Sequence, residues 1–143
     1  MKSLFAKVGI ILVIGIVNFG CAGTRRADWR LFAETQADIG VSYYDAGNTT
    51  HPSKHIVRTW IKLVYYKEGM ALQVKELGKR YEGLSYTLNL LEVNCAAKTN
   101  RVLQTTSYSK DGSIISSNQS QKTEWSFINP GSIGETLYNT VCR

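Results

Sequence analysis

The sequence has few of the residues on which most catalytic and metal sites depend. Among its 143 residues there are only two histidines, and its three cysteines lie far apart. His51 and His55 have the spacing of two metal ligands on a helix, but Pro52 lies between them, and the segment reads as a loop that enters a strand. A phosphate-binding glycine loop, a G-x-S-x-G element and a carboxylate pair in an apolar helical segment are all missing. The sequence therefore predicts a protein without catalysis, metal or cofactor. A small hydrolase that uses one of the histidines is the rival hypothesis.

A hydrophobic run long enough to cross a membrane is missing as well. The apolar run over residues 8–17 covers about half of the ~20 residues that a transmembrane helix needs. Lys2 and Lys7 precede this run and small residues follow it, which is the pattern of a secretory signal. We therefore expect a signal peptide over residues 1–20. A short membrane anchor over residues 4–22 is the alternative, but the polar Asn18 interrupts it.

Cys21 comes directly after this segment and is the candidate for lipidation. Gly20 is the small residue that a bacterial lipoprotein signal has before its cysteine, whereas Asn18 and Phe19 stand where such signals usually carry Leu and a small residue. Ordinary cleavage after Ala22 is the alternative. A lipoprotein cysteine carries three acyl chains, palmitate among them, and two are enough for stable anchoring. We expect residues 21–27 to form a lipid-anchored tether on the outer membrane, with the domain facing either the periplasm or the exterior.

The two remaining cysteines, Cys95 and Cys142, are an even number in an exported chain, where disulfides persist. If Cys21 carries lipid, this predicts a Cys95–Cys142 disulfide, which stabilises by about 4 kcal/mol in the chain-entropy model. If Cys21 keeps its thiol, one cysteine is left over and the connectivity is open.

The charge of the chain is mildly basic and dispersed. The formal net charge of +6 includes Lys2 and Lys7, and without these two residues it is +4. Only two pairs of basic residues are adjacent, at positions 25–26 and 79–80, so the dense basic stripe of a nucleic-acid surface is missing. Acidic glycans, anionic lipid headgroups and acidic proteins are the partner classes that fit this charge.

Hydrophobic periodicity predicts one domain over residues 28–143, which is mostly strand. Met70, Val74, Leu77 and Tyr81 have helical spacing, and a C-terminal helix has Ser132 as its N-cap with Glu135 completing a capping box. Asp111–Gly112 predicts a hairpin turn. We expect an α+β fold, a single mainly antiparallel sheet of about six strands packed against one or two helices, with one disulfide. The expected strands cover residues 29–34, 39–45, 55–66, 85–95, 101–109, 113–118 and 124–128.

Aromatic residues are the richest feature of the domain. Because successive strand residues point to opposite faces, one tyrosine of each adjacent pair at 43–44 and 65–66 is expected in the core and the other outside. We expect an outward aromatic and basic binding face around Tyr44, Arg58, Lys62 and Tyr66. The alternative is that helices bury both faces of the sheet.

A series of short motifs follows in order along the domain. They are Trp29, Tyr43-Tyr44-Asp45, Trp60-x-Lys62, Tyr65, Cys95, Tyr108-x-Lys110-Asp111-Gly112, Trp125-x-x-Ile128-x-Pro130-x-Ser132 and Cys142. This order is similar to that of the surface-adhesin protein E family of bacterial lipoproteins, and the likeness runs from Trp29 to Cys142. The resemblance implies an antiparallel sheet backed by helix, one disulfide, no catalysis, and adhesion to host extracellular-matrix proteins. A structural envelope protein that forms homodimers through the same face is the alternative function.

Overall fold

The structure is a computed structural model that describes residues 26–35, 38–119 and 124–143. The predicted signal peptide and Cys21 lie outside these residues. None of the described helices is long and apolar enough to span a bilayer.

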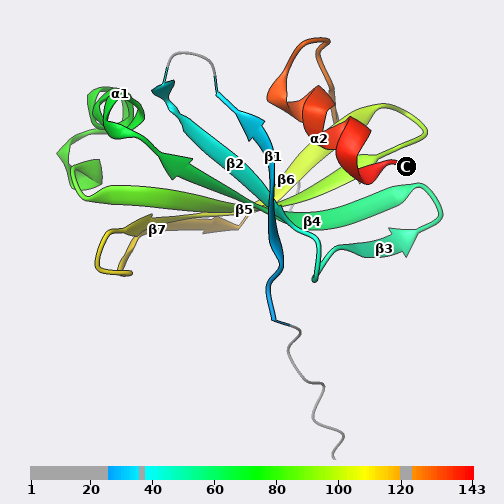
Figure 1. Ribbon diagram of the computed structural model, residues 1–143, viewed down its shortest axis with the longest axis horizontal. Helices are drawn as coiled ribbons and strands as arrows, with labels where there is room; N and C mark the ends of the chain where they lie inside the picture. The colour runs from blue at the N-terminus through cyan, green and yellow to red at the C-terminus, as the bar shows by residue number, and fades with distance from the viewer. Residues whose placement is uncertain (1–25, 36–37, 120–123) are drawn as a thin grey trace, which may run out of the picture.

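The described chain folds into one antiparallel sheet with two α-helices, which confirms the expected α+β class. Six strands follow one another across the sheet in the order β1-β2-β4-β5-β6-β7, while β3 pairs with β4 and β8 pairs with β6. Figure 1 shows both helices on the same side of the sheet. The strands are β1 (Trp29–Glu34), β2 (Gly40–Asp45), β3 (Thr50–Ser53), β4 (Ile56–Tyr65), β5 (Leu84–Asn94), β6 (Thr99–Ser109), β7 (Ile114–Gln119) and β8 (Ser126–Phe127); the helices are α1 (Lys67–Leu77), the 3-10 turn η2 (Lys79–Tyr81) and α2 (Ile133–Val141).

The main core lies between the sheet and α2. Ile61 of β4 and Val93 of β5 pack with Ile128 and with Leu137 of α2, which is 2% exposed. Each fully buried aliphatic side chain of this kind contributes roughly 1.5–3 kcal/mol. The β-branched and aromatic residues of β4 favour such a half-buried pleated surface.

The predicted Cys95–Cys142 disulfide is confirmed and fastens α2 to the end of β5. The two Cα atoms are 5.5 Å apart, and the Tyr138 hydroxyl donates a hydrogen bond to the Cys95 carbonyl at 3.1 Å. The predicted N-cap of α2 is also confirmed, since Ser132 Oγ accepts from the Glu135 N–H at 3.2 Å. The Glu135 carboxylate reaches back to the N–H of Gly131 at 2.8 Å. Within α2, Leu137 faces the core, whereas Ile133 in the first turn is exposed.

The first helix differs from the expected one. α1 begins at Lys67 and ends at Leu77, because Gly78 takes a φ of 95° that is incompatible with a helix. Tyr81, expected on the same helical face as Met70, belongs to the separate turn η2, where its hydroxyl donates to Ser116 Oγ of β7 at 3.0 Å. Leu77, the third residue of the predicted face, is half exposed.

The predicted hairpin between β6 and β7 is confirmed, with Gly112 at a φ of 85°. The hydroxyl of Ser109 and the N–H of Ser113 both donate to the Asp111 carboxylate, and they lower its pKa to about 2.

Strand β3 was not expected from the sequence, because Pro52 lies within it. All four of its residues are exposed. A strand with a proline at the edge of a sheet gives little signal in the sequence.

Candidate contact surface

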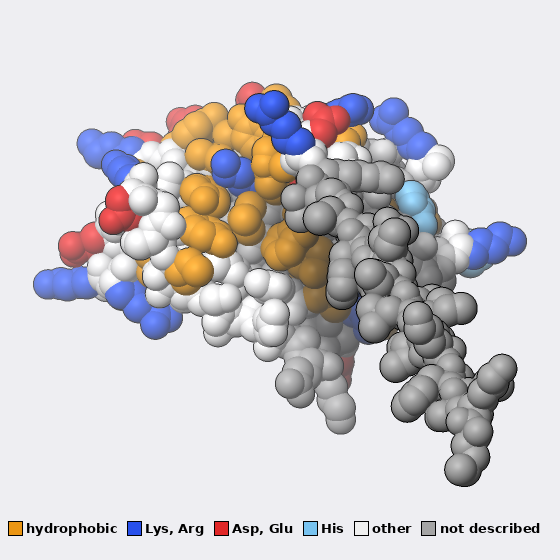
Figure 2. Space-filling model, turned by 90° about the horizontal axis from the view of Figure 1, so that it is seen from below, with side chains coloured by type: hydrophobic (Ala, Val, Ile, Leu, Met, Phe, Trp, Pro, Cys, Tyr) orange, Lys and Arg blue, Asp and Glu red, His pale blue; other side chains and the backbone are white. Residues whose placement is uncertain are grey.

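The sheet has one face covered by helices and one face without them. Residues paired directly across neighbouring strands point to the same side, so the register assigns each side chain to a face. Ile61, a core residue, marks the covered face, and Lys62 marks the opposite one, which we call the helix-free face. Figure 2 shows hydrophobic side chains gathered on this face, with a basic side chain among them. The register places on it Leu31, Tyr43, Arg58, Trp60, Lys62, Tyr86, Leu88, Leu90, Glu92, Arg101, Tyr108 and Ile114.

Lys62 lies at the centre of this face among aromatic rings. Its Nζ is 4.4 Å from the ring centroid of Tyr86 and 5.9 Å from that of Trp29, which are cation–π distances. Tyr86 is stacked in turn on Tyr108, with centroids 4.8 Å apart. None of the salt bridges among the described residues involves Lys62. The ammonium group is therefore held by ring faces while its charge is not neutralised by a neighbouring carboxylate.

Two arginines and one glutamate form a charged row at one end of the face. Glu92, whose side chain is 3% exposed, receives two hydrogen bonds from Arg58 and two from Arg101, and both Nη2–Oε distances are 2.6 Å. Burial by itself raises the pKa of Glu92, but the hydrogen bonds and charges of the arginines outweigh it, so the pKa lies below its ordinary value. Arg101 also lies over the ring of Trp125, 4.4 Å from its centroid. The row thus carries one positive charge in excess beside an exposed indole.

Exposed apolar side chains stand around the margins of the face. Leu31 is 53% exposed on the outer strand β1, and Ile114 is 60% exposed on the other outer strand, β7. Phe127 of β8 is 83% exposed and is paired with Thr99 of β6. Together with Trp125 these residues are four of the nine large hydrophobic side chains exposed in the described chain. Their grouping on one side is typical of a surface that contacts another molecule.

The comparison with protein families agrees with this domain. The family model of surface-adhesin protein E matches residues 29–143, which hold all the described strands and helices. The chain belongs to the surface-adhesin protein E family. No curated protein and no solved structure gave a match.

Of the four predicted binding residues, two lie on the helix-free face, one follows the end of a strand, and one lies on the covered face. Arg58 and Lys62 lie on the helix-free face. Tyr66 is exposed and follows the last residue of β4, at the N-cap of α1. Tyr44 is paired with Ile61 and packs edge-on against Phe32 at 6.3 Å, so it lies on the covered face. The expected grouping was wrong for Tyr44, and Tyr43 takes the outward position.

The structure also adds residues that the sequence analysis did not place in the site. Glu92, Arg101 and Trp125 come from three different strands or their flanks, and only the cross-strand register brings them together. One signal for Glu92 was present in the sequence. The alternation that places Tyr86, Leu88 and Leu90 on one side of a strand continues to this residue.

The two histidines play no part in this surface. His51 lies in β3 and His55 in the turn after it, and both are exposed. Within the described ranges no group of three or more histidine, cysteine, aspartate or glutamate side chains is arranged to hold a metal ion. The arrangement on the helix-free face is suited to contact with another molecule, through aromatic surface and cations.

Proposed function

We propose that this protein is a non-enzymatic, exported envelope adhesin that binds a protein or glycan through its helix-free face. In this proposal Cys21 carries the lipid anchor, and host extracellular matrix is one source of the partner. Membership of the surface-adhesin protein E family supports the adhesin role. The observation that carries the choice of surface is Lys62, a cation set among aromatic rings on an uncovered sheet face.

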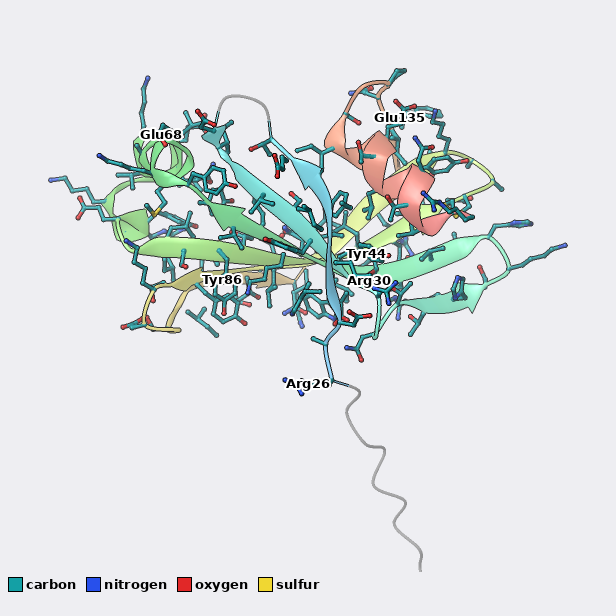
Figure 3. The ribbon with its side chains drawn as sticks, in the orientation of Figure 1. Arg26, Arg30, Tyr44, Glu68, Tyr86 and Glu135 are labelled. Carbon is teal, nitrogen blue, oxygen red and sulfur yellow. A yellow bond between two sulfur atoms is a disulfide. The ribbon has the colours of Figure 1, made fainter. Side chains whose placement is uncertain are left out.

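The orientation of the chain supports this choice. Figure 3 shows Glu68 of α1 and Glu135 of α2 on one side of the sheet, with Tyr86 and Arg26 on the other. The polypeptide therefore enters the sheet from the side of the helix-free face. Arg26 is five positions after Cys21, and such a length spans at most roughly 18 Å when extended. A lipid at Cys21 would hold the face within short reach of the membrane and of molecules at its surface.

The experiment compares two charge reversals in cells that carry the full chain. Lys62→Glu reverses the charge at the centre of the face, and Lys75→Glu reverses an exposed charge on α1, behind the sheet. We expect adhesion to immobilised extracellular matrix to be lost with Lys62→Glu and kept with Lys75→Glu, at equal amounts of protein in the envelope. Equal adhesion of the two variants would refute the proposed surface.

A structural role through self-association is the second candidate, and the exposed apolar margin favours it. The size of the face weighs against an obligate dimer. The six strands, 6 to 11 residues long and about 4.8 Å apart, give a face of roughly 800 Å², below the ~1,000 Å² or more per partner that obligate dimers bury. A symmetric contact over the centre would also bring the two Lys62 side chains together. Sedimentation decides the matter: a stable dimer that Phe127→Ser dissolves and Leu72→Ser leaves intact would support self-association.

A further inference from the structure

We propose that the helix-free face binds an acidic glycan, a chain of sugar rings that carries carboxylate or sulfate groups. This inference rests on the proposed function, because it names the class of partner for the same surface. It is drawn from the order of charges and rings along the face, from the cations that remain available, and from the dimensions of the surface.

The order of side chains along β4 is the first observation. Arg58, Trp60 and Lys62 occupy successive positions on the helix-free face, so a cation, an indole ring and a cation follow one another about every 7 Å. An acidic glycan presents a matching alternation. The apolar C–H faces of its sugar rings pack on aromatic rings, while its acidic groups meet the cations.

This row continues at both ends. Beyond Arg58, across β5, Arg101 lies over the Trp125 ring at 4.4 Å. Beyond Lys62, the stacked Tyr86 and Tyr108 rings provide a second aromatic surface, with the Lys62 ammonium 4.4 Å from the nearer ring. The strand positions from Arg58 to Val64 span roughly 20 Å. The track is therefore long enough for an oligosaccharide of several rings.

The cations on this track keep bonding capacity. Both arginines bind Glu92 through Nε and Nη2, and no hydrogen bond among the described residues uses the Nη1 of either. Glu92 offsets one of these two charges, and Lys62 has no carboxylate partner among the described side chains. A neutral partner that covered these groups would desolvate them without compensation. A ligand with acidic groups supplies the missing charge.

The shape of the surface favours a glycan over an acidic protein. The face is roughly 800 Å² in area, but its cations and aromatic rings lie along one line, from Arg58 past Trp60 to Lys62. A single glycan chain can occupy such a line without a large complementary surface.

The test measures binding of size-defined heparin, with neutral dextran as the matched probe. The full chain is produced with its own leader, purified from the envelope, and followed by tryptophan fluorescence. We expect heparin to bind, dextran not to bind, and heparin affinity to fall as salt rises. Lys62→Gln should weaken heparin binding about fivefold, and it should reduce the salt dependence by about one released counterion. Lys75→Gln is the control and should change the affinity less than twofold.

A second variant separates stacking from charge. Trp125→Leu should weaken heparin binding without changing its salt dependence, because it removes an exposed ring and no charge. Equal urea midpoints of the variants and the wild type show that the effects do not come from unfolding.

Three results would overturn the acidic glycan. Equal losses of heparin affinity in Lys62→Gln and Lys75→Gln would show that only long-range electrostatic attraction contributes to binding. Binding of polyglutamate in place of heparin, with the same dependence on Lys62, would identify an acidic protein. Binding of phosphatidylglycerol vesicles in place of heparin would identify a lipid surface. If Lys62→Glu abolishes cell adhesion but heparin neither binds nor competes, the proposed function stands and the glycan class is wrong. If Lys62→Glu also leaves cell adhesion unchanged, both the proposed contact surface and the glycan class are wrong.

Discussion

Gly69 of α1 occupies a position that has no room for a side chain. A Cβ built on Gly69 would lie 2.8 Å from the carbonyl carbon of Ile39, 3.1 Å from its Cα, and closest to its carbonyl oxygen. Gly134 of α2 is the matched position, since it is also a glycine within a helix. Its Cβ would meet only side-chain atoms, the nearest being Asn100 Nδ2 at 3.3 Å and Ser132 Oγ at 3.4 Å.

The two substitutions to alanine should therefore have opposite effects. Alanine is more favourable than glycine inside a helix by about 1 kcal/mol. At Gly69 this gain is offset by overpacking, which costs about 1–3 kcal/mol and cannot be relieved by rotating a side chain, because the obstacle is backbone. Moving α1 away would also weaken the hydrogen bond from the Tyr66 N–H to the Ile39 carbonyl, now 2.9 Å long, at a cost of about 1 kcal/mol. We expect Gly69→Ala to lose about 2 kcal/mol of stability and Gly134→Ala to be neutral or up to about 1 kcal/mol more stable.

Equilibrium urea unfolding under oxidising conditions, followed by tryptophan fluorescence, measures both free energies. The comparison holds the residue change constant and varies only what the new methyl group meets. A Gly69→Ala variant as stable as Gly134→Ala would show that α1 does not approach the backbone of Ile39 this closely.

Three further predictions concern the disulfide and two carboxylates. Replacing both Cys95 and Cys142 with alanine should lower the free energy of unfolding by about 4 kcal/mol, and a loss below ~1 kcal/mol would contradict the entropic argument. Glu92→Gln should cost about 2 kcal/mol, less than a fully buried pair because both arginines are partly exposed, whereas Asp28→Asn at an exposed pair should cost under ~0.5 kcal/mol. The pKa of Asp111 is lowered to about 2, so its contribution to the β6–β7 hairpin is complete above the ordinary value of 3.8 and is lost as the pH falls through about 2. Titration of this carboxyl by NMR should give a midpoint near 2, and a midpoint near 3.8 would refute the hydrogen bonding described for it.

The features predicted correctly from the sequence are those that depend on local chemistry. The alternation of β4 follows from strand geometry, which puts Val57, Thr59 and Ile61 on one face, and all three are buried. The turn at Gly112 and the N-cap at Ser132 each depend on a few neighbouring residues. The disulfide followed from counting cysteines in a chain that the sequence predicts to be exported.

Which face of the sheet is covered was decided only by the tertiary structure. Period-two alternation separates Tyr43 from Tyr44, but the choice between them depends on where α1 and α2 pack, and these helices come from distant parts of the chain. In the same way Glu92 is brought to Arg58 by the pairing of β4 with β5, across 34 residues of sequence. The sequence by itself determined the alternation, the turn, the cap and the cysteine pair, because each depends on neighbouring residues or on a count. Burial of one face and charge pairing across strands depend on long-range packing, and the contact surface therefore became visible only in the folded chain.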